Sequence, residues 1–289
     1  MKYFFTLASV VLIAQFSVAQ SNSNYEKVLP GVVKVSDGLY FDQTEITNVN
    51  WLEFLYWQFK NQGGRESAAY KATLPDTALW MEDGMSAELY MKWYHRHPSY
   101  KDYPVVNVTW QQAADFCAWR TARVKEYLEA NKKADDAPFY FAYRLPTYEE
   151  FRIMYDDIAE LPDFIGEEGK RKDRGKVRYN QKREPSQYAQ VADESSAMAD
   201  VTAPVKSYWP NSYGVYNIKG NVAEWFMQEN TYAGGSWKTP LSADESLLPR
   251  TVTPQTPDAL DSNWYYSEPF IVPQDSKIAR IETHMEGAD

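Results

Sequence analysis

The sequence predicts a single α+β domain with little regular secondary structure, for three reasons. Helical hydrophobic patterns that follow a side-chain cap occur three times, with short strands and long connections around them. Aromatic residues make up 16% of the 289 residues, a load that suits a loop-rich core held by packed rings. The hydrophobic content of 44% is enough for one substantial core, and no change of composition along the chain indicates a second.

The N-terminus has the pattern of a secretory signal. Lys2 supplies a positive charge, residues 4–14 are apolar but too few to span a bilayer, and a small-x-small cleavage pattern ends at Ala19. We therefore predict a signal peptide at residues 1–19, followed by an N-terminal lead-in at residues 20–39.

The mature chain is predicted to be an acidic, exported protein. Without the basic residue of the signal, 29 basic and 40 acidic residues remain, a net charge of −11. This acidity argues against a nucleic-acid partner. No later apolar run reaches the length of a membrane span, and no cysteine is placed to take a lipid. We therefore expect neither a transmembrane segment nor a lipid anchor.

Three threonines are predicted to cap helices. Thr47 precedes a helix whose apolar positions include Trp51 and Phe54. Thr109 and Thr147 each have a Gln or Glu three residues later, which is the capping-box pattern. The apolar positions of the second and third helices are Phe116, Val124 and Leu128, and Phe151, Met154 and Tyr155, respectively.

A charged insert at about residues 156–200 follows the third helix. Residues 156–168 are rich in Asp and Glu, and a basic run occupies residues 170–183. Because the acidic flank can neutralise the basic run locally, we expect a solvated, partly self-paired surface loop rather than a contact to an anionic partner.

Histidine and cysteine offer few candidate ligands. His95 and His97 would lie on one side of an extended segment and form a candidate metal pair, but transition-metal sites need three or four ligands and no third is evident. Cys117 is the only cysteine, so no internal disulfide can form. It lies in a helical apolar stripe with Ala113 and Phe116, where a cysteine is usually inert packing.

Residues 210–237 hold the most distinctive pattern, PNSYGVYNIKGNVAEW followed by GGSW. This pattern resembles the signature of the formylglycine-generating-enzyme (sulfatase-modifying factor) domain family, whose members typically read PN-x-(F/Y)-G-L-Y-D-M-x-GNV-x-EW and then RGGSW. The resemblance implies a C-type-lectin-like fold for residues 40–289, with a divergent part from residue 240 in which Ile278-Ala-Arg-Ile281 replaces the family's closing GFR. Four further blocks resemble the family in the same order: residues 42–48, 103–110, 113–119 and 144–150.

The resemblance also indicates which chemistry is missing. Catalytic members of the family bind copper through two cysteines after the GGSW motif, and here these positions are Thr239 and Asp244. Copper(I) prefers soft thiolate ligands, which a hydroxyl and a carboxylate do not replace. We therefore expect no copper and no catalytic residue.

Calcium is a structural candidate. Family members often hold calcium around the GNV-x-EW loop, so the resemblance implies side-chain oxygens from Asn221 and Glu224, which suit a hard cation. In the alternative, Asn221 hydrogen-bonds the turn and Glu224 pairs with an arginine or with backbone amides.

Exported proteins of gliding motility and type IX secretion in Bacteroidetes-like bacteria form the branch that looks nearest. This resemblance implies a noncatalytic scaffold or binding protein that is periplasmic or associated with the outer membrane, with an envelope or outer-membrane complex as its partner. Two alternatives stay open, namely a formylglycine-generating oxidase that uses unfamiliar residues and a carbohydrate-binding lectin-like module. The stretches that carry the resemblance are residues 44–48 with 54–57, 97–106, 116–121 and 205–211.

Overall fold

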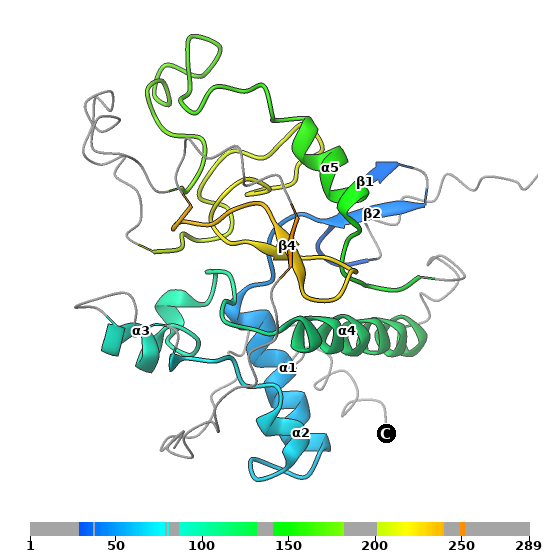
Figure 1. The fold of residues 1–289 in the computed structure, drawn as a ribbon. Coiled ribbons are helices and arrows are strands. Elements are labelled where there is room, and N and C mark those ends of the chain that lie inside the picture. Colours follow the sequence, from blue (N-terminus) through cyan, green and yellow to red (C-terminus); the bar gives the residue numbers. More distant parts are fainter. Residues whose placement is uncertain are drawn as a thin grey trace, which may run out of the picture.

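The computed structural model describes residues 29–36, 38–78, 80, 87–131, 141–181, 201–239 and 249–251. The predicted signal peptide, residues 182–200 of the charged insert, Asp244 and most of the divergent C-terminal part lie outside these residues. The described part has short helices and small sheets joined by long irregular segments (Figure 1). The predicted α+β class with little regular secondary structure is confirmed.

The three predicted helix starts are confirmed. Thr47, Thr109 and Thr147 are the N-caps of α1, α4 and α5, and each forms a complete capping box. In each box the threonine side chain accepts a hydrogen bond from the third helical N–H, and the side chain at that third position accepts one from the cap backbone. The helices of the described chain are α1 (Asn48–Asn61), α2 (Ala68–Lys71), α3 (Ala87–Trp93), α4 (Trp110–Ala130) and α5 (Tyr148–Asp156), with a 3-10 turn at Pro98–Tyr100.

The strands are short and form two antiparallel sheets. β1 (Val32–Ser36) pairs with β2 (Leu39–Asp42). The second sheet has the order β3 (Glu224–Trp225), β4 (Thr231–Ala233), β5 (Arg250–Thr251). Sheets of this size are not stable alone, so their positions depend on packing against the rest of the chain.

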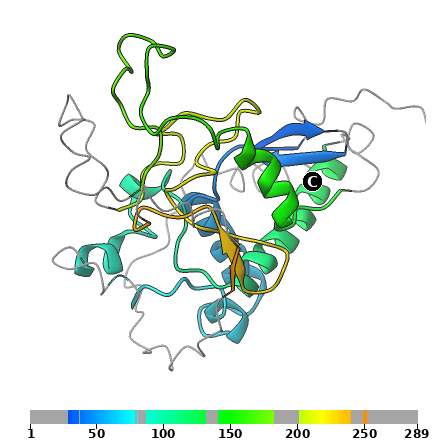
Figure 2. The same cartoon turned by 45° about the horizontal axis from the view of Figure 1, so that its top comes forward.

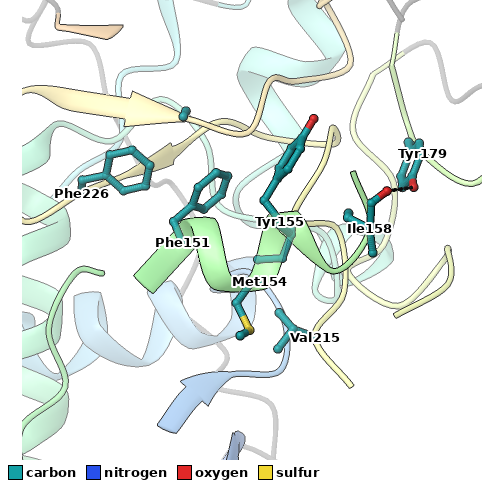
Figure 3. Close-up of a cluster of buried hydrophobic side chains, with 9 residues drawn as sticks. Phe151, Met154, Tyr155, Ile158, Tyr179, Val215 and Phe226 are labelled. Atoms are coloured by element: carbon teal, nitrogen blue, oxygen red, sulfur yellow. Dashed lines mark hydrogen bonds between the residues drawn. The ribbon is translucent and has the colours of Figure 1, made fainter. Parts of the chain in front are cut away.

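One aromatic core lies between α5 and the loop segments around the second sheet. Phe151 and Met154 of α5 are fully buried, and the ring centre of Phe151 lies 5.2 Å from that of Phe226 (Figure 3). Val33 and Phe41 of the β1–β2 sheet pack against the same cluster. Accordingly, α5 lies beside β1 and β2 in both views of the ribbon (Figure 1 and Figure 2).

A second aromatic core joins α1 to α4. Trp51 stacks on Phe116 with ring centres 5.3 Å apart, and Phe54 meets Phe116 edge-on at 5.7 Å. The Trp51 indole N–H donates to the backbone carbonyl of Thr73 at 3.1 Å, which satisfies its polar atom inside the core. The expectation of a core fixed by aromatic rings is therefore confirmed for the described chain.

The described part of the charged insert is a self-paired loop. Arg174 Nη1 lies 2.7 Å from Glu167 Oε2, and Arg178 forms an ion pair with Glu168. Two basic residues of the run therefore pair with the acidic flank. Such exposed pairs contribute little to stability, because solvent screens their charges. No helix within the described ranges is both long and apolar enough to cross a bilayer.

Candidate functional site

Residues 211–222 form a loop with several left-handed backbone conformations. Asn217 and Asn221 have φ values of 55° and 61°, and Gly220 has a φ of 83°. Asn and Gly adopt this region at the lowest cost, which explains the composition of the segment. The loop turns the side chains of Asn211, Asn217 and Asn221 into the protein, where all three residues are buried.

The side chain of Asn221 is fully buried and uses its whole hydrogen-bonding capacity. Its Oδ1 accepts from Asn180 Nδ2 at 3.0 Å and from the backbone N–H of Ala203 at 2.8 Å. Its Nδ2 donates to Glu45 Oε1 at 2.8 Å and to the carbonyl of Ala203 at 3.2 Å. Asn221 therefore holds together three segments that are far apart in the sequence.

Two carboxyl groups with raised pKa values lie beside this network. Glu45 also accepts from Asn217 Nδ2 at 3.1 Å. Burial raises the pKa of Glu45 to about 7, although its hydrogen bonds to the two asparagines oppose the shift. Burial, followed by the charges of Glu45 and Asp42, raises the pKa of Glu224 to about 8. Both groups therefore exchange protons near neutral pH.

We expect the free energy of unfolding to fall as the pH rises from about 5 to about 9. The ordinary pKa of both carboxyls is 4.5, so the folded chain retains protons that the unfolded chain releases. Stability is then lost as the pH passes the folded values of about 7 and about 8. Glu224→Gln removes one of these groups, so the variant should gain Tm relative to the wild type at pH 9 and not at pH 5. Thermal unfolding at both pH values measures this, and a Tm difference independent of pH would contradict it.

A cavity of about 750 Å³ lies next to these carboxyl groups, between β1–β2, α4 and the segments 142–146 and 222–225. On its wall Arg120 donates through Nη1 and Nη2 to the two carboxylate oxygens of Asp42, at 2.6 and 2.8 Å. The Arg120 guanidinium also lies 3.9 Å from the ring centre of Tyr143. This bidentate pair fastens α4 to β2.

Cys117 lines the same cavity and is half-buried, so it is not sealed in the core. Burial and the charge of Asp42 raise the pKa of its thiol to about 12, with Arg120 opposing, so the reactive thiolate is scarce. We expect iodoacetamide to alkylate Cys117 at pH 8 at least about 100-fold more slowly in the folded chain than in urea. Mass spectrometry of the alkylated chain gives both rates, and similar rates would show a reactive thiol.

Thr239, at the first of the family's cysteine positions, is half-buried in a tight turn. Its hydroxyl accepts a hydrogen bond from the backbone N–H of Ser236 at 2.9 Å, and its own N–H donates to the Ser236 carbonyl at 2.9 Å. The side chain therefore closes the turn. With this hydroxyl and a single cysteine in the whole sequence, the donor set does not fit monovalent copper.

The two residues predicted to hold calcium, Asn221 and Glu224, differ in how far their side-chain oxygens are already hydrogen-bonded. Both lone pairs of Asn221 Oδ1 accept N–H groups, so the side chain of this residue presents no free oxygen to a cation. The described residues supply neither a hydrogen bond nor an arginine to the carboxylate of Glu224. Within the same residues no group of three or more His, Cys, Asp or Glu side chains could hold a metal ion. Calcium binding through Glu224 stays a prediction.

The two neighbouring histidines have separate surroundings. His95 is buried, its Nε2 lies 3.0 Å from the Val106 carbonyl, and burial lowers its pKa to about 4. Its ring is therefore neutral at pH 7. His97 is exposed, and its Nδ1 accepts from the backbone N–H of Ser99 at 3.2 Å. The structure does not bring the two rings together as a metal pair.

Three participants in the site were not predicted from the sequence. Glu45 and Asp42 lie in the block at residues 42–48, and Arg120 lies in the stretch 116–121, but neither pattern shows with which distant residue a charge will pair. The signal available was the charge of Arg120 inside the largely apolar stretch 116–121, because a charge that becomes buried needs a partner.

The capped helices, the small sheets and the asparagine-rich loop define a domain of the formylglycine-generating-enzyme-like class. The chain belongs to the family of sulfatase-modifying factor enzyme 1-like domains, whose profile matches residues 5–253.

Known proteins similar to this chain include a formylglycine-generating enzyme and a serine/threonine-protein kinase. The chain is 26% identical over 251 residues to the formylglycine-generating enzyme of Mus musculus, a match that covers 75% of this chain and 54% of the relative. It is 28% identical over 156 residues to a serine/threonine-protein kinase of Chlamydia caviae, covering 53% and 18%. The chain thus spans about half or less of these relatives. Among solved structures, Treponema denticola variable protein 1 is 18% identical with a TM-score of 0.35, covering 74% of this chain and 79% of that one.

Proposed function

We propose that this chain is a noncatalytic scaffold or binding protein of a periplasmic cell-envelope machine, of the type IX secretion or gliding-motility kind. One observation carries the proposal. The chain forms the framework of the family, but it lacks the pair of cysteines through which catalytic members bind copper. The Asn221 network is complete, but Thr239 supplies a hydroxyl where the family has its first cysteine. The one remaining thiol, Cys117, is held in its protonated form.

Part of the described surface suits contact with a partner protein. Leu89 and Trp93 lie one helical turn apart on α3 and are 61% and 39% exposed. Residues at this spacing share a face of a helix, so two large apolar side chains meet solvent together. A binding role gives these side chains a partner to pack against.

Gene deletion tests the role in a host that has both type IX secretion and gliding. We expect the deletion to impair secretion or surface motility, and normal levels of both would contradict the proposal. Affinity purification of the tagged mature chain from envelope fractions should in addition copurify an outer-membrane complex. Leu89→Asp should weaken that copurification, while Glu88→Gln, beside it on α3, should not.

The similarity to a formylglycine-generating enzyme favours one alternative, an oxidase that acts on sulfatase cysteines. Incubation of the mature chain with copper(I), oxygen and a cysteine-containing sulfatase peptide separates the two functions. A scaffold leaves the mass of the peptide unchanged. Stoichiometric copper loading together with conversion of the peptide thiol to an aldehyde would overturn the proposed function.

A further inference from the structure

Two carboxyl groups without a cationic partner line the wall of the 750 Å³ cavity. Of the described carboxylates that line it, Asp42 pairs with Arg120 and Glu150 with Arg144, each at 2.6 Å. Glu45 and Glu224 have no cationic partner among the described residues, since Glu45 is held by two neutral asparagine amides. These two carboxyl groups line the same cavity, and they are close enough for the charge of Glu45 to act on Glu224.

Aromatic rings form another part of the same wall. Trp225 and Tyr232 lie edge to face with ring centres 5.6 Å apart, and both line the cavity with Trp237. The Trp225 indole N–H donates to the carbonyl of Val108 at 3.0 Å, which fixes the orientation of that ring. Aromatic faces attract cations as well as apolar groups.

We propose that this cavity binds a small organic cation, an ammonium or amidinium group on a planar apolar body. The charge lies beside Glu45 and Glu224, and the body packs against Trp225 and Tyr232. A carboxylate removed from water is costly unless a cation or hydrogen bonds compensate it, and the bound cation supplies this at Glu224. The volume of the cavity falls in the range of small-ligand sites. This site is independent of the proposed scaffold role, because it can be filled whether or not the chain joins an envelope machine.

Benzamidine is a suitable probe, and benzamide, its uncharged analogue of the same shape, is the control. In calorimetric titrations of the full mature chain we expect saturable benzamidine binding, at least about tenfold tighter than that of benzamide. Glu224→Gln keeps the shape of the wall and removes its charge, so it should weaken benzamidine binding at least about tenfold. Glu229→Gln, exposed in the turn between β3 and β4, should leave the affinity unchanged.

A second variant tests the location of the ligand without changing charge. Ala113 of α4 lines the cavity, and Ala113→Leu places a larger side chain in it while keeping a strong helix former. We expect at least about a tenfold loss of benzamidine affinity with an unchanged or higher Tm. The same change at Ala118, which is exposed on α4, should affect neither quantity.

Several outcomes would overturn the proposal. The absence of saturable benzamidine binding to the wild-type chain is one, and equal affinity for the wild type and Glu224→Gln is another. Equal binding of benzamide would show an apolar pocket that is indifferent to charge. If the wild type binds calcium and not benzamidine, and Glu224→Gln abolishes this, the carboxylate serves a metal ion instead.

Discussion

Asn221→Ala is expected to lower the free energy of unfolding by about 4 kcal/mol or more. The change removes the hydrogen-bond partner of the Asn180 amide, of the Ala203 backbone and of the Glu45 carboxylate. A buried polar group left without a partner costs about 1–3 kcal/mol, and several are orphaned together here. Urea unfolding followed by tryptophan fluorescence measures the loss.

Asn230 provides the matched control for this variant. It is also an asparagine with a left-handed φ, of 56°, but its side chain makes no hydrogen bond within the described chain. Asn230→Ala should therefore cost only the backbone strain of alanine in this region, about 1–2 kcal/mol. Equal losses for the two variants would show that the side-chain network of Asn221 contributes little.

Gly220→Ala is the other change with a large expected effect, a loss of about 3–5 kcal/mol. The backbone at Gly220 has a φ of 83°, which strains any residue with a Cβ. That Cβ would also lie 2.7 Å from the Asn180 carbonyl oxygen and 2.8 Å from Gln181 Cγ. Because a backbone oxygen cannot move aside as a flexible side chain can, the 180–181 segment must shift and disturb the Asn180 contacts to Asn221.

Gly175→Ala separates the steric effect from the strain. Gly175 has a φ of 80°, almost the same as Gly220, but a Cβ there meets nothing within 4 Å. We expect this variant to lose only the strain of about 1–2 kcal/mol. The difference between the two free energies of unfolding then measures the close approach at residue 220, and its absence would contradict the packing described.

The helix starts were predictable because their determinants are local. A threonine and the residue three positions later decide a capping box, so Thr47, Thr109 and Thr147 could be identified from neighbouring residues alone. The strands could not be located in the same way. A two-residue strand such as β3 exists because β4 pairs with it, and no local pattern of that length distinguishes it from a turn.

The loop of the site could be predicted from the sequence, but the properties of its two carboxyl groups could not. The density of Asn and Gly indicated the irregular turn at residues 211–222. The side chain of Asn221 hydrogen-bonds not the turn itself, as the alternative to calcium had it, but Glu45, Asn180 and Ala203. The pKa of Glu45 is raised by burial, and that of Glu224 by burial and by the charges of Glu45 and Asp42. These effects arise only when residues almost 180 positions apart meet in the fold. The family resemblance suggested Glu224 as a metal ligand, but its surroundings in the fold had no signal in the sequence.

The bonds from Glu45 to the asparagine-rich loop also set an order of events during synthesis. Its partners Asn217 and Asn221 lie 172 and 176 residues further along the chain. Until residue 221 has emerged, the N-terminal segment cannot complete its native contacts, and most of the chain is already out of the ribosome by then. Contacts between such distant residues slow folding and leave apolar surface open to aggregation. A nascent chain of this protein is therefore expected to lack these contacts, and to expose the surface that they cover, until residue 221 has been synthesised.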